Sequence, residues 1–135
     1  PPEVNLFNEK NNGETLLKLI DNNLIKSAHD VSLGGIITAT AKMCIKGKKG
    51  ISIKKPKYLI NEVEYLFAED QGRYILEINK KDFKKVADIL NKNAVHFDEL
   101  GTICENELYI NEKTKVTIDE LSTSNKSWLI NYMSK

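Results

Sequence analysis

One short stretch constrains the fold of this chain more than any other. It is the run at residues 27–35, SAHDVSLGG, which is followed directly by the apolar segment 36–44, IITATAKMC. Hydrophobic residues lead into a polar turn that contains two glycines, and an apolar pattern with helical spacing leads out of it. A strand, a turn and a helix in this order can direct backbone amides and a helix N-terminus at an anion. The run therefore predicts a strand–turn–helix unit with a candidate anion site.

Hydrophobic periodicity predicts further helices and strands on both sides of this unit. Residues 1–12 are polar and are expected to be extended, and Ser32 is expected to cap the helix at 36–45. Thr117 and Glu120 match a capping box, and Trp128 and Tyr132 on the helix that follows are interpreted as core anchors. The other expected helices are 13–23, 58–67 and one capped by Asp82, and the expected strands are 24–31, 51–53, 73–79, part of 95–103, and a hairpin around 111–114. Strands and helices mixed in this order indicate an α+β or α/β fold, in which helices cover a mixed sheet.

Composition excludes several classes of function. The chain has 135 residues, which suits one domain, and a formal net charge of +1, which indicates neither a nucleic-acid nor a membrane partner. Arg73 is the only arginine, whereas readers of nucleic acid usually depend on arginine. The 2 cysteines, Cys44 and Cys104, form no C-x-x-C pair, so no metal site is expected. Separated thiols and the lack of a secretion signal favour a cytoplasmic protein.

The residues that can carry chemistry lie in two polar clusters. His29 and Asp30 are expected to stabilise the turn by hydrogen bonds, and no nucleophile is paired with His29, so no catalytic residue is predicted. The second cluster, at 69–73 (EDQGR), has two interpretations. Its polar groups converge on a ligand at a sheet edge, or they form a network at a helix end with Gly72 as the C-cap.

Four segments, in order along the whole chain, resemble one family, bacterial phosphoribosylformylglycinamidine synthase. Residues 1–13 resemble the linker that opens the last domain of its synthetase subunit, and residues 27–35 resemble the signature of that domain. Residues 66–74 (LFAEDQGRY) resemble its second motif, and residues 128–133 (WLINYM) resemble its C-terminal tail. Two positions depart from the family pattern. Leu33 stands where an acidic residue is usual, and Ala68 stands where glycine is usual, and both bear on the edge of the ligand site.

The resemblance implies a single domain at 1–135 with a linker at 1–12, and an α+β fold with α/β/α layers that is partly ferredoxin-like, of the AIR synthase C-terminal type. It implies part of a ligase of de novo purine biosynthesis that uses ATP and Mg, which are bound mainly by domains absent here, so that this chain alone is inactive. The implied partners are the other domains of the synthetase and a glutaminase subunit or domain. The implied site, related by pseudo-symmetry to the substrate site, holds an auxiliary nucleotide or a phosphate; its residues are Ser32, Gly34, Gly35, Glu69, Gln71 and Arg73.

Two alternatives stay open. A free-standing ferredoxin-like module that binds a small molecule or a protein, without catalysis, fits the same elements. A kinase-like enzyme of the same superfamily is a further alternative, although the tail around Trp128 and Tyr132 argues against it.

Overall fold

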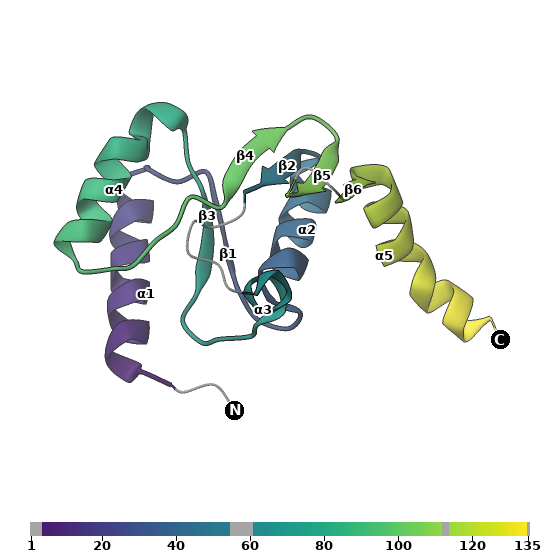
Figure 1. Cartoon of the computed structure of the whole chain (residues 1–135), viewed down its shortest axis with the longest axis horizontal. Coiled ribbons are helices and arrows are strands. Elements are labelled where there is room, and N and C mark those ends of the chain that lie inside the picture. Colours follow the sequence, from purple (N-terminus) through teal and green to yellow (C-terminus); the bar gives the residue numbers. More distant parts are fainter. Residues whose placement is uncertain (1–3, 55–60, 112–113, 135) are drawn as a thin grey trace. The chain divides into compact units, whose positions relative to one another are not determined.

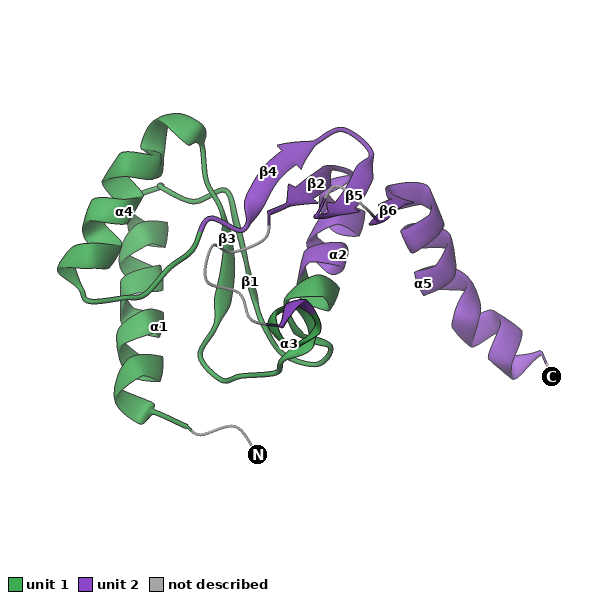
Figure 2. Cartoon of the chain, viewed as in Figure 1, with its two compact units in different colours: residues 1–39, 63–98 green, residues 40–62, 99–135 purple. Residues whose placement is uncertain are grey.

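The computed structural model describes residues 4–54, 61–111 and 114–134 (Figure 1). The chain divides into two compact units, which Figure 2 distinguishes by colour. Unit 1 comprises residues 1–39 and 63–98, and unit 2 comprises residues 40–62 and 99–135. The first boundary between the units along the chain falls inside the helix α2 (Gly35–Gly47).

Unit 1 contains a two-stranded antiparallel sheet and three further helices. The strands β1 and β3 pair in the register Ser27↔Glu77 to Asp30↔Tyr74. A buried cluster of Leu19, Leu24, Val86 and Leu90 joins α1 to α4, and Leu76 of β3 packs against it. Val86 and Leu90 lie one turn apart on α4, Leu19 lies on α1 and Leu24 follows α1, so their burial holds both helices in place. The elements are α1 (Leu6–Asp21), β1 (Ser27–Asp30), α3 (Glu62–Phe67, of which residues 63–67 belong to this unit), β3 (Tyr74–Glu77), a 3-10 turn (Lys80–Asp82) and α4 (Phe83–Lys92).

Unit 2 is built on a four-stranded mixed sheet in the order β4-β2-β5-β6. The central strand β2 (Gly50–Ile53) runs antiparallel to β4 (Gly101–Cys104) and parallel to β5 (Glu107–Ile110). The edge strand β6 (Thr114–Thr117) is antiparallel to β5 and leads directly into α5 (Ile118–Met133). Ile53 and Leu108 are each 2% exposed, as expected of neighbouring strands in the middle of a sheet.

The structure confirms the mixed α+β class and corrects several local predictions. Residues 6–12 are helical rather than extended, because α1 begins at Leu6 after Asn5, whose side chain accepts from the Asn8 backbone amide at 3.0 Å. Ser32 does not cap α2, which begins only at Gly35. The helix predicted at 58–67 is observed as α3, which spans Glu62–Phe67. Residues 58–60 of the prediction lie outside the described residues. The short strand expected at 51–53 is confirmed as the centre of the sheet of unit 2.

The last helix gives one confirmation and one correction. The capping box is present: the Glu120 backbone amide donates to Thr117 Oγ1 at 3.2 Å, and the Thr117 backbone amide donates to Glu120 Oε2 at 2.8 Å. The interpretation of Trp128 and Tyr132 as core anchors is wrong, because these side chains are 61% and 68% exposed. Apolar spacing locates a buried face on a helix only if another element of the same chain covers it.

Candidate functional site

Strand pairing in unit 1 brings the two sequence motifs together. Asp30, at the end of β1, lies opposite Tyr74, at the start of β3. The ladder continues one step further, since the Val31 backbone amide donates to the Arg73 carbonyl at 2.9 Å. The run at 27–35 and the cluster at 69–73 are therefore neighbours in space, although about forty residues of sequence separate them.

The glycine turn is closed by contacts within the protein. The Gly34 amide donates to Glu69 Oε1 at 2.7 Å, and the Gly35 amide donates to the Ser32 carbonyl at 3.0 Å. Both glycines have left-handed backbones, with φ of 81° and 68°, a conformation that favours glycine. The amides predicted to meet an anion are thus already occupied, one of them by a carboxylate of the chain itself.

Arg73, the only arginine of the sequence, makes several contacts in the loop between α3 and β3. Its Nη2 donates to the Ala68 carbonyl, and its Nη1 lies 3.5 Å from Asp70 Oδ2. Its Nε is buried and has no hydrogen-bond partner among the described residues. Gly72 has φ of 69° and accepts at its carbonyl from the Asn12 side-chain amide at 3.0 Å, which ties this loop to α1. Gly72 is not a helix C-cap, as the second interpretation had it, because α3 ends at Phe67. The ligand interpretation stays a prediction, and residues of the same cluster line a cavity.

A cavity of about 580 Å³ lies where these segments meet in unit 1. Its wall combines three carboxylates with two cations, so the site is polar and carries both signs of charge. The lining residues are Glu9, Lys10, Asp30, Val31, Ser32, Leu33, Glu69, Gln71, Gly72, Arg73 and Tyr74.

Four of the six predicted binding residues line this cavity: Ser32, Glu69, Gln71 and Arg73. Gly34 and Gly35 are not among the lining residues, and they shape the turn behind the wall. Sequence reasoning missed Glu9 and Lys10, because it assigned residues 1–12 to an extended linker. Asn5, a residue type favoured at helix N-caps, was the signal that could have found them.

His29 and Asp30 make a local contact at the end of β1. His29 Nδ1 lies 2.6 Å from the Asp30 carbonyl oxygen and 3.3 Å from Asp30 Oδ1. Asp30 lines the cavity, whereas His29 is not among the lining residues. In α3, burial and the charge of Asp98 raise the pKa of Tyr65, whereas the charge of Arg73 lowers it.

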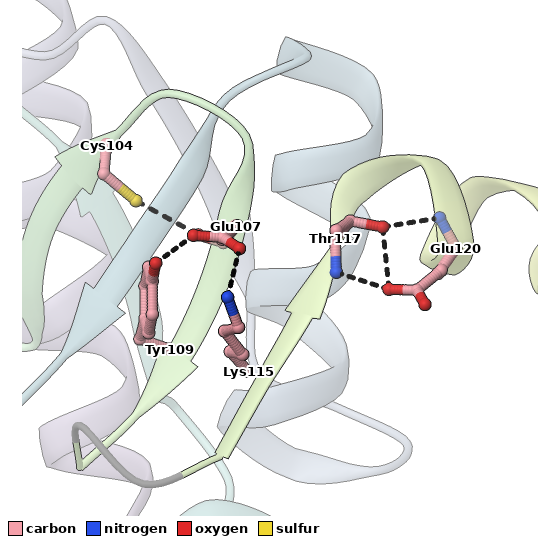
Figure 3. A network of polar contacts seen from close by, with 6 residues as sticks. All are labelled: Cys104, Glu107, Tyr109, Lys115, Thr117 and Glu120. Atoms are coloured by element: carbon pink, nitrogen blue, oxygen red, sulfur yellow. Dashed lines mark hydrogen bonds and ion pairs between the residues drawn. The ribbon is translucent and has the colours of Figure 1, made fainter.

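A second polar network lies in unit 2 and is separate from the cavity (Figure 3). Glu107 accepts from the Tyr109 hydroxyl and, at 3.0 Å, from Lys115 Nζ, while its backbone carbonyl accepts from Cys104 Sγ at 3.0 Å. The bonds from Tyr109 and Lys115 lower the pKa of the Glu107 carboxyl. These contacts join β4, β5 and β6 and are those of a sheet-stabilising cluster. Burial, with a smaller effect of Cys104, raises the pKa of Cys44 to about 11.

Two features are absent from the described residues. They contain no group of three or more His, Cys, Asp or Glu side chains that could hold a metal ion. Among the same residues, no helix is both long enough and apolar enough to cross a membrane.

Comparison with known proteins places the chain in a family. Residues 1–111 match the family described as AIR synthase related protein, C-terminal domain, and the chain belongs to this family. A curated relative from Pelagibacter ubique, phosphoribosylformylglycinamidine synthase subunit PurL, is 67% identical over 133 residues, which are 98% of this chain and 18% of the relative. The subunit PurL of Bartonella henselae is 36% identical over 100% of this chain and 18% of its own length. The resemblance stated from the sequence is thereby confirmed.

A solved structure supports the fold. The structure named T. maritima PurL complexed with FGAR matches with a TM-score of 0.76 at 22% identity, over 88% of this chain and 21% of that one. This likeness confirms the fold class. The chain spans less than one fifth of the length of the curated PurL relatives, at 18%.

Proposed function

We propose that this chain serves as the C-terminal domain of a phosphoribosylformylglycinamidine synthase subunit. In this role it is part of an ATP-dependent ligase of de novo purine biosynthesis, located in the cytoplasm, and it contributes no catalytic residue of its own. The observation that carries the proposal is the 67% identity to the P. ubique subunit over 98% of the chain. Other domains of the synthetase and a glutaminase subunit or domain are its proposed partners, and ATP and Mg are proposed to bind mainly to those domains.

Within that role, the cavity of unit 1 is proposed to be one wall of a site for a nucleotide or a phosphate. Lys10 and Arg73 supply positive charge for a phosphate group. Lys10 Nζ lies 3.8 Å from Glu14 Oε1 in an exposed ion pair, which is weak enough for a phosphate to replace. Glu69 and Gln71 supply acceptors for sugar hydroxyls, and Ser32 adds a group that both donates and accepts. A wall with both signs of charge suits a ligand that carries an anion and several hydroxyl donors better than it suits phosphate alone.

A chimeric enzyme tests the role of the chain. The matching segment of the P. ubique subunit is replaced by this chain, and the chimera is expressed in a bacterial strain that lacks the synthase and requires purines. We expect growth without purines from the chimera and no growth from this chain alone. A chimera that is soluble and folded but gives no growth would contradict the proposal and favour the non-catalytic binding module.

A matched pair of lysine variants tests the site. Both Lys10, in α1, and Lys46, in α2, are exposed on helices, but only Lys10 lines the cavity. Calorimetric titration of the chimera with a ribonucleoside 5′-phosphate is expected to show weaker binding in Lys10→Ala and unchanged binding in Lys46→Ala. Equal affinities in both variants would remove the cavity from the proposed site and leave the role of the chain as a domain intact.

A further inference from the structure

The C-terminal half of α5 carries a run of large apolar side chains that are exposed. Residues 128–133, WLINYM, contain five large apolar or aromatic side chains, and each is more than half exposed: Trp128, Leu129, Ile130, Tyr132 and Met133. At 3.6 residues per turn these side chains spread over about 200° of the helix circumference, and Asn131 lies on the remaining side. A contiguous exposed apolar patch of this width marks an interaction site.

This segment has a defined shape before any partner arrives. The rings of Trp128 and Tyr132, one helical turn apart, meet edge to face with centroids 5.7 Å apart and an interplanar angle of 74°. The helix ends at Ser134, whose backbone amide and hydroxyl both donate to the Ile130 carbonyl, at 3.1 and 2.7 Å. Because the backbone of this segment is already helical, docking carries no cost for ordering the main chain.

The comparisons indicate where the partner lies. The family match ends at residue 111, before β6 and α5, whereas the long PurL relatives match 98–100% of the chain and thus include α5. The helix is therefore shared with the long subunits but lies outside the region that defines the family. Because the chain spans 18% of the length of those relatives, most of such a polypeptide lies outside it. We propose that residues 128–133 dock into an apolar recess on another domain of the same long polypeptide.

Two other occupants fit the helix less well. A helix that lies on an anionic bilayer needs a polar face rich in Lys and Arg, but the described charged residues of α5 are Asp119, Glu120 and Lys126. A symmetric contact of the helix with its copy would cover a narrow stripe, whereas the apolar side chains here form a band about 200° wide. A recess on a larger body covers the whole band.

Residue-resolved oxidation tests this inference, which rests on the proposed function. Hydroxyl-radical footprinting with mass spectrometry measures the oxidation rates of Trp128, Tyr132 and Met133 in this chain alone and in the chimera with the P. ubique subunit. Trp128 is the only tryptophan of the chain, so its peptide is unambiguous. We expect several-fold slower oxidation of all three residues in the chimera. Equal rates in the two proteins would overturn the proposal.

A matched pair of variants on the same helix completes the test. Ile130→Asn places a polar group in the apolar segment, and Lys126→Gln changes the polar part of α5. In the chimera, Ile130→Asn is expected to restore rapid oxidation of Trp128 and to lower the melting temperature, whereas Lys126→Gln changes neither. In this chain alone both variants melt like the parent, because Ile130 is 67% exposed.

The remaining outcomes are also decisive. Protection of Trp128 in this chain alone that grows with protein concentration would assign the patch to a second copy. Protection only on adding phosphatidylserine vesicles would assign it to a membrane. Either result overturns the inference. Failure of the proposed function is separate, because it appears as an inactive chimera, whereas failure of this inference appears as an unprotected α5 in an active one.

Discussion

The glycine pair at the turn allows a prediction whose size follows from the structure. Gly34 and Gly35 both have left-handed backbones, so alanine at either position is strained by about 1–2 kcal/mol. They differ in what a new Cβ would meet. At Gly35 it would lie 2.6–2.7 Å from backbone atoms of Leu66 and Phe67, at the end of α3. At Gly34 the closest atom is Thr38 Oγ1, at 2.2 Å, which can rotate away, but Thr38 Cβ lies at 2.9 Å and can move only with α2.

Gly35→Ala is therefore expected to destabilise the chain more than Gly34→Ala. Backbone atoms of α3 cannot move aside without shifting the helix, and overpacking of this kind adds about 1–3 kcal/mol. We expect a loss of about 1–3 kcal/mol in the free energy of unfolding for Gly34→Ala, and about 2–5 kcal/mol for Gly35→Ala. Losses of this size are a large share of the stability of an ordinary domain.

Urea unfolding followed by far-UV circular dichroism measures these differences by linear extrapolation. Gly47→Ala is the control, since Gly47 ends α2 with nothing within 4 Å of a new Cβ. That variant is expected to be neutral or to gain up to about 1 kcal/mol, because alanine suits a helix better than glycine does. The reasoning would be refuted if Gly34→Ala lost as much as Gly35→Ala, or if Gly35→Ala matched the control.

Three further predictions concern unit 2. Thr117→Ala removes the capping-box acceptor and is expected to lower the free energy of unfolding by about 1 kcal/mol, measured by urea titration. Because hydrogen bonds lower the pKa of Glu107 below its ordinary value of 4.5, the ionised carboxylate stabilises the folded state above that pH. This contribution is lost as the pH falls through the lowered pKa, so Glu107→Gln should unfold with a weaker dependence on pH below 4.5 in acid titrations. Since Cys44 is buried and has a pKa of about 11, iodoacetamide at pH 8 should alkylate Cys104 first; peptide mass spectrometry reads the order, and faster labelling of Cys44 would contradict its burial.

The sequence predicted most elements that depend on local signals. The capping box at Thr117 was recognisable because both of its hydrogen bonds join residues three apart. The short strand at 51–53 was recognisable from its alternation, but its central place in the sheet was not. That place depends on pairing with strands about fifty residues later, which no local pattern encodes.

The candidate site shows the same division. The two motifs were identifiable as polar clusters beside glycines, and their proximity follows from the antiparallel pairing of Asp30 with Tyr74. The contributions of Glu9 and Lys10 were missed, because polar residues in the first turns of α1 look like a linker until the helix is placed against the loop at 69–73. The exposure of Trp128 was missed for a related reason: apolar content alone does not say whether the covering surface belongs to this chain.

The contact between Glu69 and Gly34 changes the chemistry expected of the turn. A left-handed glycine amide next to a helix start suits an anion, and the structure supplies that anion from its own α3–β3 loop at 2.7 Å. A bound phosphate at the same amide would have to displace a carboxylate and would lie close to its charge. The cations that line the cavity are Lys10 and Arg73. The Gly34 amide therefore fixes Glu69 in the cavity wall, and in the proposed site the second carboxylate oxygen of Glu69 and the Gln71 side chain contact the ligand.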